Sequence, residues 1–288
     1  MNFGAIIGHD NIKTALTAVI ENSTVSHAYI FYGRSGIGKT DTARVFAKML
    51  TNDSMADVIE VTNDRYNIKK AAALSVDTVR LARAEMFVRP YSADKKVFIF
   101  PGADVMSVQA QNALLKVLEE PPSYIVIILI VENQSVLLPT IRSRAISHRF
   151  SPLSDEVIAK SVNTSDIILN LSNGSISRAK ELTEDEEIKT VIKNFMPLAQ
   201  KLRDSSYSDV YTVINFFEKE KANCDILFDI LIITFRDLLL INDKKCDTMS
   251  AVCIIELIEK SRKALQSNAN YNMVISELLL GIKERNVQ

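Results

Sequence analysis

Residues 28–50 read AYIFYGRSGIGKTDTARVFAKML, and this stretch decides the fold. The apolar run over 28–32 is typical of a buried strand, and a helical pattern follows over 39–50. Between them, Gly33–Thr40 matches the phosphate-binding pattern GxxxxGK(S/T). A glycine-rich loop between a strand and a helix is a common phosphate site in α/β proteins. The sequence therefore predicts a nucleotide-binding domain.

Each residue type in this loop suits a phosphate. Glycine lets backbone N–H groups wrap around the anion, and the helix N-terminus adds positive potential. The Lys39 ammonium can reach the outer phosphates, and the Thr40 hydroxyl can hold Mg²⁺. A tight glycine turn without a ligand is the alternative, but three of the chain's eight glycines fall here, which favours a nucleotide. The predicted contacts are Gly33, Arg34, Ser35, Gly36, Ile37, Gly38, Lys39 and Thr40.

The rest of the first 150 residues alternates between apolar runs and amphipathic patterns. Strands are expected at 57–61, 97–100, 124–131 and 146–150, and helices at 11–22, 75–87 and 107–120. Ser75 is expected to cap the second of these helices. Strands that alternate with helices predict a parallel sheet with helices on both faces.

The pattern changes after residue 150. Only two of the seven prolines and two of the eight glycines follow, and long helical patterns cover 208–220, 225–241, 250–265 and 270–285. We therefore expect an α/β nucleotide-binding domain over 1–150, a helical lid over 151–187 and an all-α domain over 188–288.

Composition narrows the class of protein. With 288 residues, 47% of them hydrophobic, the chain can bury more than one core. Residues 1–150 carry 17 lysines and arginines against 14 acids, which permits a nucleic-acid partner without arguing for one. The cysteines at 224, 246 and 253 have neither disulfide nor zinc spacing. No apolar run reaches the about 20 residues of a membrane span, and no signal-peptide pattern is visible, so we expect a cytoplasmic protein.

The segment KVFIFPGADVM, residues 96–106, departs from the pattern of a nucleotide-hydrolysing enzyme. In such enzymes a later strand ends in an Asp that helps to hold Mg²⁺ and a Glu that orients the attacking water. Pro101 and Gly102 occupy these positions here, and neither side chain carries an oxygen. Asp104 is the nearest carboxylate, but it lies up to about 10 Å farther along an extended chain and is expected to cap the approach to the next helix. The segment predicts nucleotide binding with little or no hydrolysis.

Several stretches together resemble the clamp-loader subunits of bacterial DNA polymerase III, which are AAA+ proteins. They are GAIIGHDNIKTALTAVI, SHAYIFYGRSGIGKT, AQNALLKVLEEPP, ENQSVLLPTIRSRA and NGSISRAKEL. The resemblance extends to about residue 185. It implies a P-loop AAA+ domain with a parallel sheet, a small helical lid and a C-terminal all-α collar domain that packs with other subunits. It also implies a role in DNA replication, with ATP or ADP as cofactor, together with Mg²⁺.

Two departures indicate the kind of clamp-loader subunit. Motor subunits of that family carry a cysteine-rich zinc module after the phosphate loop and keep the Asp-Glu pair. Here the segment KMLTNDSMADVIEV contains no cysteine, and the pair is missing. The resemblance is therefore to a non-motor subunit at the end of the ring, without zinc. The implied partners are the motor and delta subunits in a heteropentamer, the sliding clamp, and primer-template DNA through the assembly, with no membrane partner.

The resemblance implies two further site residues. The family's Ser-Arg-Cys motif lends its arginine to the ATP of a neighbouring subunit, and here it reads Ser143-Arg144-Ala145. Arginine suits this task because its planar fork stays charged and can meet a phosphate with two hydrogen bonds. A local salt bridge is the alternative for Arg144. Arg178 matches the lid arginine that faces bound phosphate in the same chain. Where motor subunits sense the γ-phosphate with a polar residue, Glu132 would repel it.

Two functions remain open at this point. The first is a non-motor clamp-loader subunit that binds nucleotide, hydrolyses it poorly or not at all, and supplies Arg144 to a neighbour. The alternative is an active clamp-loader-type ATPase that uses Asp104 or a neighbour's carboxylate. The segment 65–96 carries eight lysines and arginines against three acids. It is expected to be a solvated helix face, or a surface that meets the clamp or DNA phosphates.

Overall fold

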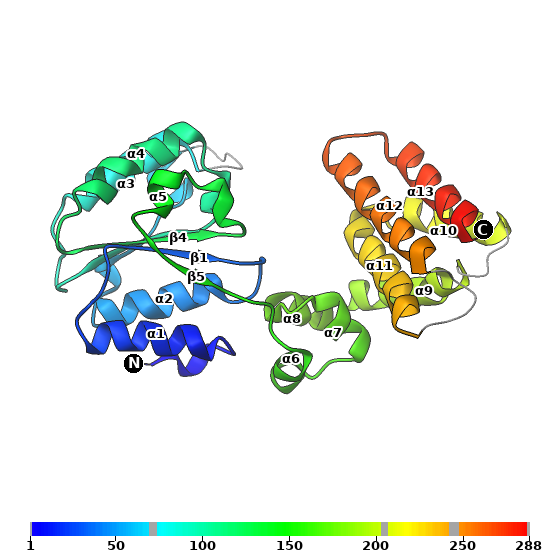
Figure 1. The fold of residues 1–288 in the computed structure, drawn as a ribbon, viewed down its shortest axis with the longest axis horizontal. Helices are drawn as coiled ribbons and strands as arrows, with labels where there is room; N and C mark the ends of the chain where they lie inside the picture. Colours follow the sequence, from blue (N-terminus) through cyan, green and yellow to red (C-terminus); the bar gives the residue numbers. More distant parts are fainter. Residues whose placement is uncertain (1, 69–73, 203–206, 242–247, 287–288) are drawn as a thin grey trace. The chain divides into compact units, whose positions relative to one another are not determined.

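The computed structural model describes residues 2–68, 74–202, 207–241 and 248–286 (Figure 1). The chain divides into two compact units. Unit 1 comprises Met1–Asn163 and Gly174–Arg178, and unit 2 comprises Thr164–Asn173 and Ala179–Gln288. The short segment Gly174–Arg178 therefore returns to unit 1 after the chain has entered unit 2.

Unit 1 is built on a five-stranded parallel sheet with the strand order β2-β3-β4-β1-β5. The strands are β1 Ala28–Tyr32, β2 Val58–Glu60, β3 Lys96–Phe100, β4 Ile125–Val131 and β5 Ile146–Arg149. All five expected strands are present. Tyr32, the last residue of β1, lies opposite Val131 and Arg149, so the phosphate loop begins level with the ends of β4 and β5.

Helices cover both faces of this sheet, which confirms the predicted architecture. In Figure 1, α1 and α2 lie on one face, and α3 and α4 lie on the other. The helices of unit 1 are α1 Asp10–Glu21, α2 Lys39–Leu50, α3 Val76–Met86, α4 Val108–Glu119, α5 Pro139–Arg142 and α6 Asp155–Ser161. Short 3-10 helices are η1 Phe3–Ala5, η2 Met55–Asp57, η3 Asp64–Tyr66, η4 Ala103–Val105 and η5 Gln134–Val136.

Strand β4 shows why the apolar runs are continuous. All its residues are buried, and successive side chains enter different cores. Ile127 and Leu129 pack with α3 and α4. Ile128 and Ile130 pack with α1 and α2. A strand with a core on each face needs apolar residues at every position, which is typical of parallel sheets.

Serine side chains begin the two helices of the second face. The Ser75 hydroxyl accepts a hydrogen bond from Thr78 N at 3.0 Å, which confirms the expected cap of α3. The Ser107 hydroxyl accepts one from Ala110 N at 3.2 Å and caps α4 in the same way. Such caps satisfy backbone N–H groups that have no partner inside the helix.

The described regular elements of unit 2 are all helices. Its helices are α7 Asp166–Ser172, α9 Glu186–Lys201, α10 Tyr207–Lys219, α11 Cys224–Ile241, α12 Thr248–Gln266 and α13 Tyr271–Asn286, with η6 Lys221–Asn223. Helix α8, Ile176–Glu184, begins in unit 1 and continues into unit 2. Three buried rings join helices at the centre: Phe217 lies 5.5 Å from Phe195 and 5.7 Å from Phe228, measured between ring centroids. The four helical patterns expected after residue 200 are all present.

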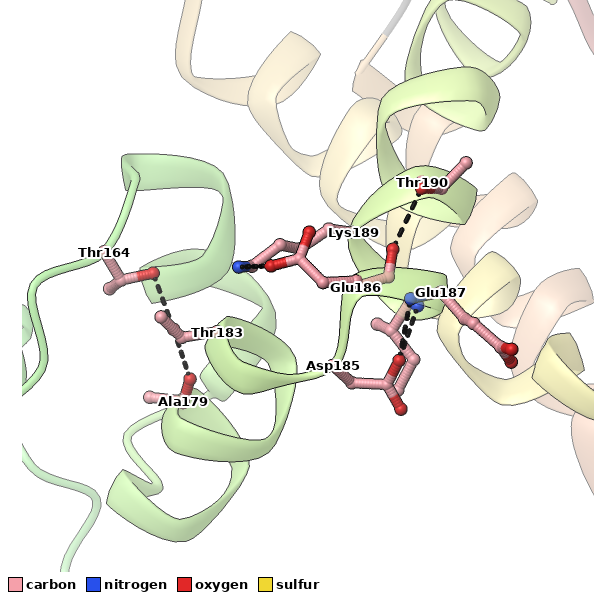
Figure 2. Close-up of polar contacts among 9 residues, drawn as sticks. Thr164, Ala179, Thr183, Asp185, Glu186, Glu187, Lys189 and Thr190 are labelled. Atoms are coloured by element: carbon pink, nitrogen blue, oxygen red, sulfur yellow. Dashed lines mark hydrogen bonds and ion pairs between the residues drawn. The ribbon is translucent and has the colours of Figure 1, made fainter.

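The junction between α8 and α9 is defined by side-chain hydrogen bonds (Figure 2). The Asp185 carboxylate accepts from Glu187 N at 2.9 Å and from Ile188 N at 3.0 Å, and so caps α9. In the last turn of α8, the Thr183 hydroxyl donates to the Ala179 carbonyl at 2.6 Å. Asp185 is the single residue between the end of α8 and the start of α9.

The remaining expectations concern membrane spans, the domain bounds and the cysteines. No helix among the described residues is long and apolar enough to cross a membrane. The division into 1–150, 151–187 and 188–288 stays a prediction. Cys224 and Cys253 are half-buried free thiols, and Cys246 lies outside the described residues.

Candidate nucleotide-binding site

A cavity of about 220 Å³ opens where β1, β3 and β4 end. Ligands of parallel α/β sheets bind at this edge. Five of the predicted loop residues line the cavity: Ser35, Gly36, Gly38, Lys39 and Thr40. The other lining residues are Asp41, Gly102, Asp104, Ile130, Val131, Glu132 and Ser177. The fold thus brings the phosphate loop together with the turn after β3 and the end of β4.

Close backbone approach explains why the loop begins with glycine. Gly33 N donates to Val131 O at 3.2 Å, and the Gly33 backbone has a φ of 146°. A Cβ at this position would lie 2.2 Å from Phe150 O, which is shorter than any real contact. Only glycine fits here, because it has no Cβ and adopts a positive φ without strain.

Lys39 is held inside the loop by backbone carbonyls. Its Nζ donates to Gly33 O at 2.5 Å and to Arg34 O at 2.6 Å, and the residue is only 7% exposed. Burial lowers the pKa of this ammonium, and the negative charges of Glu132 and Asp104 act in the opposite direction. A phosphate would offer Lys39 charged acceptors in place of neutral carbonyls, and hydrogen bonds between charged groups are the stronger kind.

Four predicted contacts do not line the cavity. The carbonyls of Gly33 and Arg34 accept hydrogen bonds from the lining residue Lys39. Ile37 is 1% exposed and packs in the core between the sheet and helices α1 and α2. Arg178 lies next to the lining residue Ser177, and its backbone N donates to the Ser175 hydroxyl at 3.2 Å. A nucleotide contact of these residues stays a prediction.

The turn after β3 places a carboxylate in the cavity. Gly102 adopts a left-handed conformation with a φ of 67°, and η4 follows at once. This turn brings Asp104 to the cavity, although it lies beyond the position where an Asp-Glu pair would stand. The expectation that Asp104 caps the approach to α4 was wrong, because Ser107 is the cap. The Asp104 carboxylate instead accepts a hydrogen bond from Glu132 N at 2.6 Å.

Glu132 lines the same cavity, directly after β4. Its side chain is exposed, and its charge acts on Lys39. The site therefore contains three carboxylates, those of Asp41, Asp104 and Glu132, beside the phosphate loop. Like charges repel, so these groups would oppose an added γ-phosphate unless a cation lies between them.

The donors in the cavity fit Mg²⁺ bound together with a nucleotide. Mg²⁺ is usually held by one or two carboxylates plus substrate phosphates. The Thr40 hydroxyl and the Asp104 carboxylate line one cavity. Among the described residues, no group of three or more His, Cys, Asp or Glu side chains could hold a metal ion alone. Nucleotide phosphates and water would supply the remaining oxygen ligands of a Mg²⁺ bound here.

Arg144 lies away from this cavity, between α5 and β5. Its guanidinium donates to Thr140 O at 2.9 Å and forms an ion pair with Glu119 at 3.2 Å. The short helix α5 ends two residues before it. Arg144 therefore forms a salt bridge, as the alternative expected, but with a residue distant in sequence, and its role at a neighbour's ATP stays a prediction. The Arg144 side chain is 36% exposed and that of Glu119 is 50% exposed, so the pair remains open to solvent.

The basic segment 65–96 is largely engaged in local contacts. Arg65 forms an ion pair with Glu85 at 3.1 Å. Lys96 is buried, and its Nζ donates to Glu85 O at 3.1 Å. Positions 69 and 70 lie outside the described residues. Arg65 and Lys96 thus have local partners, and a contact of this segment with the clamp or with DNA stays a prediction.

Sequence reasoning missed two contacts of the phosphate loop. The Ser175 hydroxyl donates to Gly36 O at 2.8 Å, and His9 Nε2 lies 2.7 Å from Ile37 O. Neither residue belongs to a motif that predicts such a contact. The only signal was position, because both residues lie within stretches that resemble the clamp-loader family.

Comparison with known proteins identifies the family. A family model described as DNA polymerase III, delta subunit, matches residues 8–154. The chain is 28% identical to DNA polymerase III subunit delta' of Bacillus subtilis, over 92% of this chain and 93% of that protein. It is 27% identical to DNA polymerase III subunit tau of the same bacterium, over 83% of this chain but only 50% of that longer protein.

Solved structures agree on the fold. A DNA polymerase III gamma subunit-related protein of Thermotoga maritima is 18% identical, with a TM-score of 0.56 over 94% of this chain and 99% of that chain. A RuvB variant of the same bacterium is 16% identical, with a TM-score of 0.50 over 99% of this chain and 89% of that chain. At these identities the likeness establishes an AAA+ fold and no particular activity.

Proposed function

Since the chain belongs to the DNA polymerase III delta-subunit family, we propose that it is a non-motor, delta'-type subunit of a clamp loader. In this role it binds ATP or ADP between the phosphate loop and the end of β4. It hydrolyses the nucleotide poorly or not at all. Its partners are the motor and delta subunits of a heteropentamer, which acts on the sliding clamp and primer-template DNA.

The end of β3 carries the main argument for the non-motor role. Pro101 and Gly102 stand where a hydrolysing subunit needs an Asp and a Glu, while Gly33–Thr40 next to them is complete. Loss of a positioned general base typically lowers a rate by about 10²–10⁴. A site with an intact phosphate loop and no carboxylate directly after β3 is suited to holding a nucleotide rather than to hydrolysing it.

Arg144 is proposed to serve the ATP site of a neighbouring subunit. Its ion pair with Glu119 does not oppose this role, because exposed pairs contribute only about 0–1 kcal/mol. A phosphate of higher charge could therefore replace Glu119 as the partner of the guanidinium. The planar fork of arginine can then contact two phosphate oxygens at once.

The test uses both the isolated chain and the assembled loader. The isolated chain should bind ADP or ATP by calorimetry and release negligible phosphate. Mixed with motor and delta subunits, it should join a complex whose mass shows a pentamer. Robust DNA-stimulated ATPase activity of the isolated chain would rule out the non-motor role.

Arg144→Ala tests the second half of the proposal. We expect it to lower the ATPase rate of the assembled loader about tenfold or more, as loss of an arginine that contacts ATP does elsewhere. The complex should keep its mass. Arg142→Ala is the matched control, because Arg142 lies two residues away on the same exposed segment. An unchanged rate for Arg144→Ala would remove this arginine from the proposed role.

One observation favours an alternative function, a slow clamp-loader-type ATPase. Asp104 lines the cavity together with Lys39 and Thr40, although it lies outside the usual strand-end position. A carboxylate there could hold Mg²⁺ or accept a proton from water. Slow turnover by the isolated chain that disappears in Asp104→Asn would favour this alternative.

A further inference from the structure

Two consecutive carbonyls of the phosphate loop are held by side chains from distant parts of unit 1. The Ser175 hydroxyl donates to Gly36 O at 2.8 Å. His9 Nε2 lies 2.7 Å from Ile37 O, and because a carbonyl can only accept, the ring must donate. The two side chains come from the start of α1 and from the segment Gly174–Arg178, both of which belong to unit 1.

Ser175 is fixed by its surroundings. It is 5% exposed, so water cannot easily replace its hydroxyl. The same oxygen accepts a hydrogen bond from Arg178 N at 3.2 Å, and so begins α8. Ser177 N adds a longer contact of 3.4 Å to Gly36 O. A Cβ at Gly36 would lie 2.3 Å from the Ser175 hydroxyl, so the two segments are in close contact.

His9 also contacts its surroundings in unit 1. Its backbone adopts a left-handed conformation with a φ of 55°, just before α1. The ring packs edge-on against Phe150, with centroids 4.8 Å apart. Burial lowers the pKa of the imidazole, although the contact with Ile37 O raises it, so the neutral ring is favoured near pH 7. The neutral form that donates from Nε2 matches the observed contact.

These two contacts fix the direction of the neighbouring N–H groups. In a trans peptide, the C=O of one residue and the N–H of the next point in opposite directions. With Gly36 O turned toward Ser175, Ile37 N–H points away from Ser175. With Ile37 O turned toward His9, Gly38 N–H points away from His9. Gly36 and Gly38 line the cavity, so these N–H groups belong to the part of the loop that would meet a phosphate.

We propose that His9 and Ser175 are positioning residues that hold the phosphate loop in its binding shape before a nucleotide arrives. The inference rests on the nucleotide-binding part of the proposed function. It adds a reason for the loop to keep that shape: Gly36 O and Ile37 O each accept from a side chain outside the loop. Preorganisation of this kind raises affinity, because less ordering is left for the ligand to drive.

The first experiment measures the affinity for ADP with Mg²⁺ by calorimetry. Ser175→Ala removes the donor to Gly36 O, and His9→Asn keeps a residue that tolerates the left-handed backbone but is too short to reach Ile37 O. Each should weaken ADP binding about 5-fold, the equivalent of one hydrogen bond, and the double variant more than about 10-fold. His9→Gln places an amide N–H near the position of Nε2 and should stay within about 2-fold of the parent.

A control separates positioning from simple loss of a buried hydroxyl. Ser172 is fully buried and its hydroxyl donates to Leu169 O at 2.7 Å, but it lies in unit 2. Ser172→Ala should lower thermal stability as Ser175→Ala does, and should leave ADP affinity within about 2-fold of the parent. Equal losses of affinity in the two variants would overturn the proposal.

The second experiment needs no nucleotide. Backbone ¹⁵N order parameters of residues 36–38 should be about 0.8 or higher in the ligand-free parent and should fall below about 0.6 in the double variant. If the parent binds neither ADP nor ATP, the nucleotide-binding proposal fails, and the order parameters still decide on His9 and Ser175. Unchanged order parameters would overturn their role. Circular dichroism verifies folding, and the single variants replace the double variant if it does not fold.

Discussion

The Asp104 carboxylate accepts a hydrogen bond from the backbone N–H of Glu132 at 2.6 Å, which ties the turn after β3 to the end of β4. Both residues line the cavity that contains Lys39 and Thr40. A carboxylate has two oxygens, and the Asp104 oxygen that does not accept from Glu132 could ligate a cation. Asp104 therefore has a structural role that does not depend on hydrolysis. Its second role would be that of a Mg²⁺ ligand.

Asp104→Asn should separate these two roles. Asparagine keeps an oxygen that can accept from Glu132 N, so we expect little change in thermal stability. It lacks the negative charge, so the gain in ADP affinity on adding Mg²⁺ should fall, on the order of tenfold if Asp104 ligates the metal. Calorimetry with Mg²⁺ and with EDTA measures this gain. Asp94→Asn, at an exposed position outside the cavity, is the control. Equal gains in both variants would argue against a metal ligand at Asp104.

Glu119→Gln tests whether the ion pair with Glu119 restrains Arg144. If the guanidinium has to leave Glu119 to reach a neighbour's phosphate, the variant should keep or raise the ATPase rate of the assembled loader. The rise should be at most about 5-fold, because an exposed pair contributes no more than about 1 kcal/mol. Steady-state phosphate release by the loader is the measurement. A fall as large as that of Arg144→Ala would show instead that Glu119 orients the arginine in its working position.

Asp185→Ala should loosen the start of α9. The change removes the acceptor of Glu187 N and Ile188 N, and loss of such a cap costs about 1 kcal/mol. Hydrogen exchange of the first backbone amides of α9 should accelerate by about 5-fold, because about 1 kcal/mol changes the local opening equilibrium by that factor. Asp185→Asn should preserve the parent exchange rate, because asparagine caps helices equally well. Faster exchange throughout unit 2 with no excess at α9 would contradict a local cap.

Locally patterned elements of the fold could be predicted from the sequence, whereas contacts between distant segments could not. Strand β4 and the loop Gly33–Thr40 were predicted because their patterns are local and continuous. Helix α9 was not predicted, and it contains Pro197 within Glu186–Lys201, although a proline normally breaks a helix. The place of Asp104 depends on the left-handed turn at Gly102, and the ion pair between Arg144 and Glu119 joins segments far apart in sequence. Contacts of this kind are set by the packed fold, so local patterns do not reveal them.

Asp57 links the end of η2 to the loop that precedes β3. Its buried carboxylate accepts from the backbone N–H groups of Tyr91 at 2.6 Å, and of Ser92 and Ala93 at 3.0 Å each. The Ser54 hydroxyl adds a fourth hydrogen bond at 2.7 Å. Burial alone would raise the pKa of this carboxyl, but the four hydrogen bonds outweigh it and lower the pKa from 3.8 to about 2. The ionised form is therefore the one that unit 1 stabilises.

The effect of Asp57→Asn on stability should depend on pH. Because the folded pKa lies below the unfolded value, Asp57 stabilises the fold fully above about pH 4, and this contribution is lost as pH falls toward 2. At pH 7 the variant should lose about 1–3 kcal/mol, since its amide N–H groups cannot accept from the loop. Urea unfolding at pH 7, 5 and 3 should show the difference from the parent narrowing at the lowest pH. Asp53→Asn, exposed on the same segment, should change little at any pH. A gap between Asp57→Asn and the parent that stays constant from pH 7 to 3 would mean that the ionised carboxylate is not what holds the loop.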